Sequence, residues 1–394
     1  MQADLLCRVS IAQSHLNSAV AIIEQYRGEE PFASFLRKYF SGNKKFGSKD
    51  RRQIAHMCYC YFRLGKALMN MPTNQRIVAA LFLCSNTPDA LLDTLKPDWS
   101  EKVLLSVEEK LAIVEGKEMV SSIFPWGELL SVGLDHQQFC KSFLIQPDLF
   151  LRIRPGQAEK VELKLRQAGV IFSKPDEACI ALDNRTKIDE LIVLDKEAVV
   201  QDYNSQKVGD YMRLLPEQQK RKVWDCCAAS GGKSIMAFDL LGDIQLVVSD
   251  VRESILANLK KRFSTAGIKG YKSFVVDLTV APLSDEKFDF VIADVPCSGS
   301  GTWGRTPEQL FYFKEKLVEH YAILQRKIIS NVLTHVKPGG YILYITCSVF
   351  SAENEEMINW FLKQRQWNLI KMELLPGCSF RADTMFAALL QKPL

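Results

Sequence analysis

From about residue 208 to the end of the chain, short apolar runs alternate with longer stretches whose apolar positions recur at helical spacing. Continuous apolar strands separated by helices are typical of parallel sheets covered on both faces. The pattern therefore predicts a doubly wound α/β domain with a mostly parallel sheet. We expect its strands at residues 222–227, 245–250, 272–277, 288–294 and 341–346, and helices at 233–241, 252–267, 315–336 and 353–364.

The first 145 residues show helical spacing almost throughout. Apolar residues recur every three or four positions in 5–26 and 51–69, and again in 75–84 and 106–116. Proline and glycine punctuate the pattern near Pro125. We therefore predict an all-helical region, residues 1–145.

Residues 146–207 differ from both neighbours. One helical stretch, 158–170, lies among short β-like runs and stops at Gly169. A single helix among short strands indicates a small α+β module. The predicted domains are thus 1–145, 146–207 and 208–394. The β-like runs of the module are 149–154, 170–173, 179–183, 191–194 and 199–202.

Length and composition agree with two or three domains. The chain has 394 residues, of which 47% are hydrophobic and 24% charged, as in ordinary globular proteins. It has no uninterrupted apolar run of membrane-spanning length and no signal-peptide pattern near its start. Eleven cysteines at irregular spacing do not form a disulfide framework. We expect a monomer in the reducing cytoplasm, where each cysteine is a core residue, a metal ligand or a nucleophile.

Positive charge is concentrated near the N-terminus. Residues 1–80 hold 12 basic and 5 acidic residues, whereas residues 81–150 hold 5 and 11. Within 37–66, nine basic residues face a single acidic one, Asp50, and aromatic residues are interleaved among them. Such a stretch is either a footprint for a phosphate backbone or simply a solvated helix face, and the segment alone does not decide between them.

The polar loop from Cys226 to Gly232 lies between the first predicted strand and a predicted helix. Small residues let the backbone approach a ligand, and the helix that follows offers free N–H groups. Two ligand classes compete for this loop. Residues 229–234 nearly match a phosphate-binding loop, with Asp294 as a possible magnesium partner, but that motif needs glycine where Cys227 stands.

Aspartates at four predicted strand ends favour the second ligand, S-adenosylmethionine. Their carboxylates can accept hydrogen bonds from ribose hydroxyls, an exocyclic amine or an ammonium group, and they would repel a triphosphate. One strand-end aspartate is more simply a helix N-cap. Four at one edge of a sheet indicate a nucleoside ligand without phosphates. The four are Asp225, Asp250, Asp277 and Asp294.

Two cysteines also follow predicted strands. Cys297 comes after the fourth and Cys347 after the fifth, so both thiols are expected at the carboxyl edge beside the cofactor. A lone cysteine is usually a small buried hydrophobe, but these two lie in polar turns rich in glycine, serine and threonine. The five histidines lie away from these loops, so no metal is expected.

Three motifs resemble the RsmB/Sun family (also called Fmu) of RNA cytosine-C5 methyltransferases. Residues 225–233 (DCCAASGGK) resemble the family's cofactor loop. Residues 294–299 (DVPCSG) and 346–349 (TCSV) resemble its two cysteine motifs. The resemblance is specific over residues 149–394 and implies a class I, Rossmann-like methyltransferase domain that uses S-adenosylmethionine.

Fainter likenesses extend toward the N-terminus. Residues 200–206 resemble the segment before the family's catalytic sheet, and 151–154 resemble the opening of its small RNA-recognition module. Residues 46–52 and 61–63 resemble its helical N-terminal region, which is NusB-like in RsmB itself. The resemblance thus implies an RNA partner, expected to be 16S ribosomal RNA, with transfer RNA as the alternative.

The resemblance also implies a covalent mechanism. Cytosine C5 is a poor nucleophile until a thiolate adds at C6. Cys347 is the implied nucleophile, and Cys297 is the residue needed for release, by assisting loss of the C5 proton. Asp250 is expected to take the ribose hydroxyls, Asp277 the adenine amine, and Asp294 a place beside both methyl donor and base. The full set of expected cofactor residues is Cys227, Ala228, Ala229, Ser230, Gly231, Gly232, Lys233, Asp250, Asp277 and Asp294.

The expected RNA contacts come from the basic segment and the small module, which hold the backbone without reading sequence. They are Lys44, Lys45, Lys49, Arg51, Arg52 and Arg152. The target base must be single-stranded or flipped out. Arg262, on the helix after Asp250, is interpreted as a surface residue.

Two functions from other classes stay open. One is an RNA-dependent ATPase with a loop like the phosphate-binding loop, and the other is a non-catalytic RNA-binding protein that retains the fold. The second rests on departures from the family motifs. Ser230 and Ser351 stand where the family usually has proline, Val295 replaces proline or a small residue, and Arg154 stands where asparagine is common.

Overall fold

The computed structural model describes residues 2–114, 119–280, 285–364 and 367–394. The chain divides into two compact units. Unit 1 comprises Met1–Glu128, Asp135–Gln146 and Trp303–Glu315, and unit 2 comprises Leu129–Leu134, Pro147–Thr302 and Lys316–Leu394. Among the described helices, none is long and apolar enough to cross a membrane.

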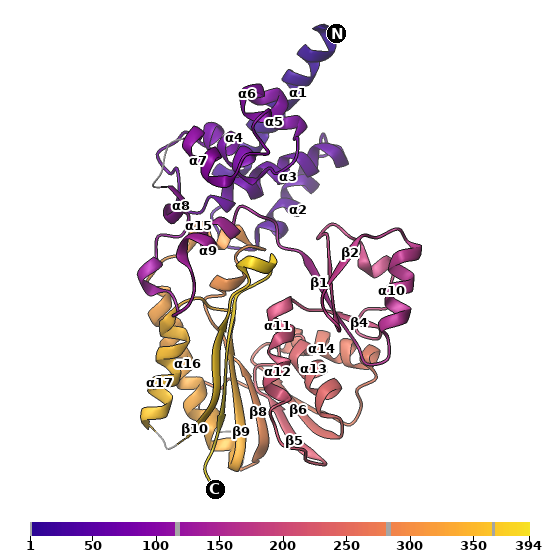
Figure 1. The fold of residues 1–394 in the computed structure, drawn as a ribbon, viewed down its shortest axis with the longest axis vertical. Coiled ribbons are helices and arrows are strands. Elements are labelled where there is room, and N and C mark those ends of the chain that lie inside the picture. The colour runs from indigo at the N-terminus through magenta and orange to yellow at the C-terminus, as the bar shows by residue number, and fades with distance from the viewer. Residues whose placement is uncertain (1, 115–118, 281–284, 365–366) are drawn as a thin grey trace. The chain divides into compact units, whose positions relative to one another are not determined.

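Unit 1 is helical, as its sequence pattern predicts (Figure 1). Its central helix is α3, where Asp50 accepts a hydrogen bond from the Gly47 N–H and so caps the first turn. The inward face of α3 is apolar and packs on α1 and α4. The helices of the unit are α1 (Gln2–Gln25), α2 (Phe32–Gly42), α3 (Ser48–Arg63), α4 (Thr73–Cys84), α5 (Ala90–Leu95), α6 (Pro97–Ser100), α7 (Val107–Val114), α8 (Met119–Ile123), α9 (His136–Ser142) and α15 (Pro307–Tyr312).

Helix α15 joins unit 1 from far along the chain. Its Phe311 ring lies 5.5 Å from the rings of both Tyr61 and Phe62 on α3. The Tyr312 hydroxyl donates to the carbonyl of Tyr26, 2.7 Å away. The helical unit is therefore not a continuous N-terminal segment, because part of its aromatic core comes from residues 303–315.

Unit 2 begins with a small four-stranded antiparallel sheet, in the order β2-β3-β1-β4, with one helix packed on it. Leu151, Val161, Leu165 and Ile180 form the centre of its core. Residues 191–194, predicted as β-like, make only a one-residue bridge at Leu194. The elements are β1 (Leu149–Ile153), α10 (Ala158–Gln167), β2 (Phe172–Asp176), β3 (Cys179–Leu182) and β4 (Ala198–Val200).

The second sheet of unit 2 has seven strands in the order β10-β11-β9-β8-β5-β6-β7. The five predicted strands are confirmed and run parallel to one another. The last two, β10 and β11, are antiparallel and were not predicted. The strands are β5 (Arg221–Asp225), β6 (Ile244–Asp250), β7 (Lys272–Val275), β8 (Phe288–Asp294), β9 (Val336–Thr346), β10 (Asn368–Leu375) and β11 (Met385–Gln391).

Helices cover both faces of this sheet, which confirms the doubly wound architecture (Figure 1). On one face pack α12 (Gly209–Met212), α13 (Gly232–Leu241) and α14 (Glu253–Ala266), and on the other α16 (Leu317–Val332) and α17 (Glu355–Gln364). A short helix, α11 (Tyr203–Lys207), leads from the small module into α12. From β5 the chain proceeds outward through β6 and β7, then returns to the other side of β5 as β8, so the strand order reverses there. Ligands of such sheets bind at the carboxyl ends of the strands beside the reversal.

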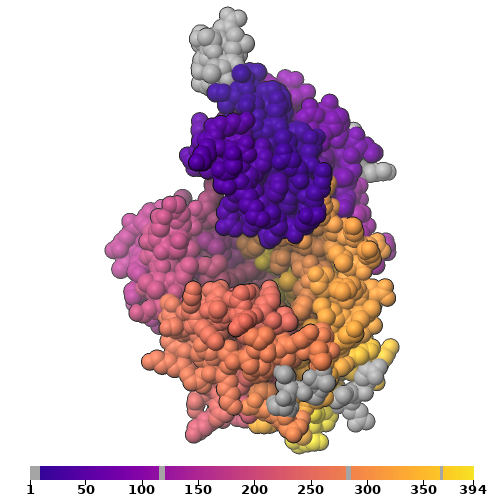
Figure 2. All heavy atoms as spheres, turned by 180° about the vertical axis from the view of Figure 1, so that it is seen from behind, coloured from indigo at the N-terminus to yellow at the C-terminus, as the bar shows by residue number. Residues whose placement is uncertain are grey.

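Seen from behind, the surface of unit 2 is hollowed between the pink and magenta small module and the orange part of the chain (Figure 2).

Candidate active site

The loop between β5 and α13 has the backbone geometry of a ligand cradle. Ala229 and Gly231 both have positive φ, +46° and +86°. A side chain at Gly231 would come within 2.7 Å of the Phe263 ring on α14, so only glycine fits there. The loop thus brings its backbone to the carboxyl edge of the sheet and starts α13 at Gly232.

A cavity of about 750 Å³ lies along this edge. Asp250, at the end of β6, accepts from the Ala229 N–H at 3.0 Å and from the Arg252 N–H at 2.9 Å. Asp277 follows β7, is exposed, and bonds Thr279. The cavity is lined by Cys226, Cys227, Ala229, Asp250, Val251, Arg252, Val276, Asp277, Leu278, Thr279, Asp294, Val295, Pro296, Cys297, Leu324, Ile328 and Cys347.

Asp225 does not join the other three strand-end aspartates, contrary to the sequence interpretation. Its side chain is fully buried and accepts from the Ser234 hydroxyl at 2.5 Å, and its Oδ1 has no hydrogen-bond partner among the described residues. Burial raises the pKa of Asp225 to about 7, although the Ser234 bond opposes the rise. The strand turns this carboxyl beneath α13, away from the cavity.

Asp294, at the end of β8, pairs with Lys233, the second residue of α13. The Lys233 Nζ lies 2.9 Å from Asp294 Oδ2. Burial disfavours the charged lysine, but Asp294, Cys347 and Asp225 outweigh it and raise the pKa of Lys233 above its ordinary value. The site therefore holds a fixed positive charge beside Cys347.

The two cysteines predicted at the carboxyl edge of the sheet lie in contact. Cys297 Sγ and Cys347 Sγ are 3.3 Å apart, because β8 and β9 are parallel neighbours and each thiol follows its strand end. Both side chains are partly exposed. The contact with Cys347, burial and the charge of Glu353 together raise the pKa of Cys297 well above its ordinary value.

A second cavity, of about 280 Å³, also reaches Cys347. It shares Ala229, Asp294 and Cys347 with the first cavity, whereas Cys297 lines the first alone. Asp294 and Cys347 are therefore accessible from both. The second cavity is lined by Val200, Gln201, Asp202, Ser205, Ala228, Ala229, Ser230, Gly232, Lys233, Arg262, Asp294, Thr302, Cys347, Asp383 and Met385.

The sequence interpretation missed two groups at the site. Arg262 is not a free surface residue: it ion-pairs with Asp195 and donates to the carbonyl and hydroxyl of Ser230. Glu353 is fully buried and accepts hydrogen bonds from the loops of both cysteines. The only signal for Glu353 is its place six residues after Cys347, in a stretch rich in acidic residues.

Two of the departures from the family motifs are accommodated by neighbouring residues. Val295 is buried in the core on the α16–α17 face of the sheet. The Ser351 hydroxyl donates to the Glu356 carboxylate at 2.7 Å, at the start of α17. Neither substitution touches the two thiols.

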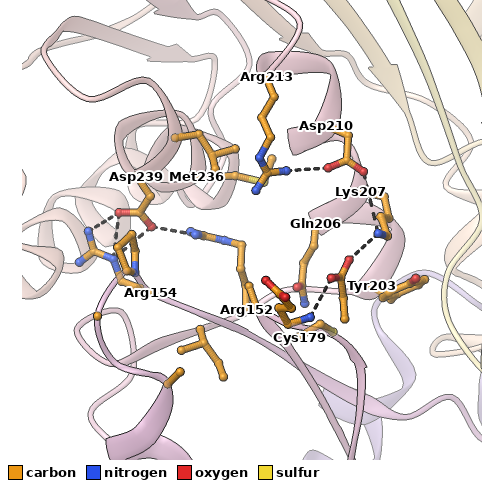
Figure 3. Close-up of a pocket in the computed structure, with 18 residues that line it drawn as sticks. Arg152, Arg154, Cys179, Tyr203, Gln206, Lys207, Asp210, Arg213, Met236 and Asp239 are labelled. Atoms are coloured by element: carbon orange, nitrogen blue, oxygen red, sulfur yellow. Dashed lines mark hydrogen bonds and ion pairs between the residues drawn. The ribbon is translucent and has the colours of Figure 1, made fainter.

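Arg152 was expected to contact RNA, which requires an exposed side chain. The structure contradicts this expectation. Arg152 is buried, pairs with Asp239 of α13 at 2.7 Å and donates to Gln201 at 2.8 Å. Arg154 pairs with the same carboxylate (Figure 3). Arg152 of β1 and Arg154, which directly follows β1, thus tie the small module to α13.

These arginines line a third cavity, of about 700 Å³. Its other cations are paired as well: Lys207 contacts Asp176 and Asp210, and Arg213 contacts Asp210 (Figure 3). Most of the positive groups on its wall are therefore paired with carboxylates of the same wall.

The five RNA-contact candidates of unit 1 lie around the start of α3. Lys44, Lys45, Lys49 and Arg52 are exposed. Arg51 is half-buried, donates to the Phe46 carbonyl at 2.9 Å and lies over the Phe40 ring. Arg63 and Lys66, also in the basic stretch, turn inward to the carbonyls of Phe143 and Phe311.

Across the described part of the chain, no group of three or more histidine, cysteine or carboxylate side chains is arranged to hold a metal ion.

Comparisons with known proteins find similar RNA methyltransferases. A family model described as 16S rRNA methyltransferase RsmB/F matches residues 212–386. The chain is 32% identical over 164 residues to the ribosomal RNA small subunit methyltransferase B of Klebsiella pneumoniae (strain 342), covering 41% of this chain and 37% of that protein. It is 33% identical over 164 residues to the tRNA (cytosine(72)-C(5))-methyltransferase NSUN6 of Mus musculus, covering 38% and 34%. The matches thus span little more than a third of these curated relatives.

Among solved structures, that of PH0851 is similar in fold, with a TM-score of 0.69 at 21% identity, covering 96% of this chain and 98% of that one.

Proposed function

We propose that this chain transfers a methyl group from S-adenosylmethionine to C5 of a cytosine in RNA, as its match to the RsmB/F family model over residues 212–386 supports. One observation carries the proposal: Asp294 and Cys347 line both the 750 Å³ and the 280 Å³ cavity. A methyl donor in the first and a base in the second would meet across these two residues.

The first cavity fits S-adenosylmethionine, which supplies a methyl group on a positively charged sulfur. Its volume is in the range of small-molecule sites. Asp250 accepts hydrogen bonds from two backbone N–H groups and from the Arg252 side chain, which leaves an acceptor position on Oδ2 for a ribose hydroxyl. Asp277 lies at the next strand end for the adenine amine, and the loop from Cys227 to Lys233 takes the methionine part. The one arginine or lysine on this wall, Arg252, is already paired with Asp250, which disfavours a triphosphate.

Cys347 is the nucleophile in this proposal. It lines the second cavity together with Lys233, a positively charged side chain. Its sulfur bonds to C6 of the cytosine, and the electron pair of the C5–C6 double bond makes C5 nucleophilic toward the methyl group. Asp294 stabilises the ring nitrogen or amino group during this addition.

Cys297 acts in the release step. Once C5 carries the methyl group, its proton must leave before the C5–C6 double bond can re-form. Cys297 takes that proton, directly or through water, and the C6–sulfur bond then breaks to return the Cys347 thiolate. Its sulfur lies 3.3 Å from that of Cys347, which supports a role beside the carbon pair that reacts.

The substrate class is ribosomal RNA of the small subunit, and its base is single-stranded or flipped out. The family description and the Klebsiella relative support 16S rRNA. The mouse relative is named for transfer RNA, so transfer RNA is the second candidate. Bisulfite mapping of both RNAs, from cells with and without the protein, separates the two.

The mechanism is tested by two alanine variants assayed with radiolabelled S-adenosylmethionine and RNA. Cys347→Ala is expected to abolish methyl transfer. Cys297→Ala is expected to accumulate a protein–RNA adduct that survives a denaturing gel. Cys84→Ala, in unit 1, is the matched control and should retain activity. Unchanged transfer by Cys347→Ala would overturn the mechanism. Binding of ATP without S-adenosylmethionine would favour the ATPase instead.

A further inference from the structure

A single buried carboxylate links the two cysteine loops. Glu353 Oε2 accepts from the Ser298 N–H at 2.8 Å, and Oε1 accepts from the Ser348 hydroxyl at 2.6 Å. Ser298 follows Cys297 and Ser348 follows Cys347 in the chain. The same side chain therefore hydrogen-bonds the residue that follows each cysteine and so fixes the distance between the two thiols.

The surroundings hold this carboxylate in place. Gln325 of α16 donates to Glu353 Oε2 at 3.1 Å and to the Pro296 carbonyl at 3.0 Å. The Tyr344 hydroxyl donates to the Glu353 carbonyl at 2.7 Å. Three donors converge on the two carboxylate oxygens, which is the compensation that a buried charge requires. A protonated carboxyl would give up one of these acceptor positions.

The charges around the two thiols are unequal. Glu353 and the hydroxyls of Tyr321 and Tyr344 face Cys297, and none of these three is a cation. Lys233, itself paired with Asp294, faces Cys347, whose surroundings also include Tyr321. A negative neighbour disfavours a thiolate and a positive neighbour favours it. The charge of Glu353 therefore disfavours a thiolate at Cys297, whose sulfur lies 3.3 Å from that of Cys347.

We propose that Glu353 is a positioning residue that sets the geometry of the Cys297–Cys347 pair and favours the protonated form of Cys297. The inference rests on the proposed function for its meaning, because a protonated Cys297 beside a Cys347 thiolate is the starting state of that reaction. Cys297 can serve as the base only after Cys347 has bonded to C6, when the negative charge on the second sulfur is gone and Cys297 can release its own proton to water. Glu353 thereby makes the order of the two steps obligatory.

Two variants separate charge from position. Glu353→Gln keeps the size of the side chain but removes its charge. Glu353→Asp keeps the charge on a chain too short to reach both loops. Glu356→Gln, three residues further on and exposed to solvent, is the matched control. Binding of S-adenosylmethionine, measured by calorimetry, reports whether each variant has folded.

The first readout is the rate of alkylation of each thiol by iodoacetamide between pH 6 and 10, resolved by peptide mass spectrometry. In the natural protein and in Glu356→Gln, Cys347 is expected to react first. In Glu353→Gln, the preference for Cys347 is expected to fall by about tenfold, the equivalent of one pKa unit. Glu353→Asp should keep the preference. An unchanged alkylation ratio in folded Glu353→Gln would overturn the proposal.

The second readout is methyl transfer. Both Glu353 variants are expected to lower kcat by roughly a hundredfold, with KM for S-adenosylmethionine unchanged, because misplaced reacting groups lose rate rather than binding. A Glu353→Asp enzyme with natural kcat would overturn the positioning role. The alkylation ratio needs no RNA, so a protein that methylates no RNA but shows the expected ratio would contradict the proposed function and leave the role of Glu353 standing.

Discussion

Arg262 of α14 donates two hydrogen bonds of 2.9 Å to Ser230, one to its carbonyl and one to its hydroxyl. The same guanidinium forms an ion pair with Asp195 of the small module. Ser230 stands where the motif that this loop resembles is expected to have proline, a residue that stiffens a loop by itself. In this chain, a side chain from the neighbouring helix supplies the restraint.

Arg262→Ala is expected to raise the Kd for S-adenosylmethionine about tenfold, because hydrogen bonds from a charged donor contribute roughly 1.5–3 kcal/mol each and part of that restraint is lost. Isothermal titration measures the change. Lys261→Ala, exposed on the same helix, should bind like the natural protein. If Ser230→Pro in the Arg262→Ala background recovers no affinity, rigidity of the loop is not what Arg262 provides.

Asp250→Asn is expected to weaken binding of S-adenosylmethionine by roughly tenfold to a hundredfold, since a carboxylate that accepts from ribose hydroxyls is worth about 1.5–3 kcal/mol. Asp277→Asn should cost less than tenfold, because its carboxylate is exposed and competes with water. Both constants come from calorimetric titration. The reverse order of the two effects would refute the assigned geometry of the cofactor.

Asp225→Asn tests the buried carboxyl at pH 4–8. The folded protein holds the pKa of Asp225 at about 7, above the ordinary 3.8. Below pH 4 the group is protonated in both states and has no effect. Between pH 4 and 7 the unfolded chain releases the proton first, so the free energy of unfolding falls as the pH rises. The full cost, on the order of 4 kcal/mol, is present above pH 7.

Urea unfolding of the natural protein and of Asp225→Asn should therefore diverge as the pH rises from 4 to 7, with the variant gaining relative stability. Asp243→Asn, an exposed site just beyond α13, is the control and should run parallel to the natural protein. Parallel curves for Asp225→Asn would show that the carboxyl ionises normally in the folded state.

The role of the basic cluster near the start of α3 in RNA binding is tested by the salt dependence of the binding constant. Replacing Lys44, Lys45, Lys49 and Arg52 by glutamine should weaken RNA binding and reduce the slope of log K against log salt. Each lost phosphate contact reduces the slope by about 0.7 for single strands, so the limit is roughly 3. Lys38→Gln is the control, since Lys38 is paired with Glu30 at 2.8 Å. An unchanged slope for the fourfold variant would place the RNA elsewhere.

The sequence was most informative where local pattern and chemistry coincide. The five parallel strands are apolar runs that end in polar loops, so their carboxyl edge and its two cysteines could be predicted. Strand β11 could not, because Met385–Gln391 is buried almost throughout and its apolar run has no alternation to distinguish strand from helix. Strand β10 has no residue that is fully buried, and its exposed positions mix apolar and polar residues, so no strand alternation marked it either.

Other features of the site depend on the direction in which a side chain points, and the spacing of residues along the sequence does not reveal that direction. Asp225 and Asp250 both end strands, yet one carboxyl points beneath α13 and the other toward the cavity. Arg152 lies on a strand of the expected RNA module but faces Asp239, a partner 87 positions away. Long-range pairing of this kind requires the packed structure, since neither residue is distinctive by itself.

The aromatic contacts of α15 bear on how the polypeptide is made. A ribosome that has completed residues 1–146 has not yet produced Phe311 or Tyr312, whose rings close the core around Tyr26, Tyr61 and Phe62. The aromatic core of the N-terminal helices therefore lacks these two rings until about four-fifths of the chain has been synthesised. A fragment cut at the apparent end of the helical region would leave that face open to solvent, so this unit is not an excisable module.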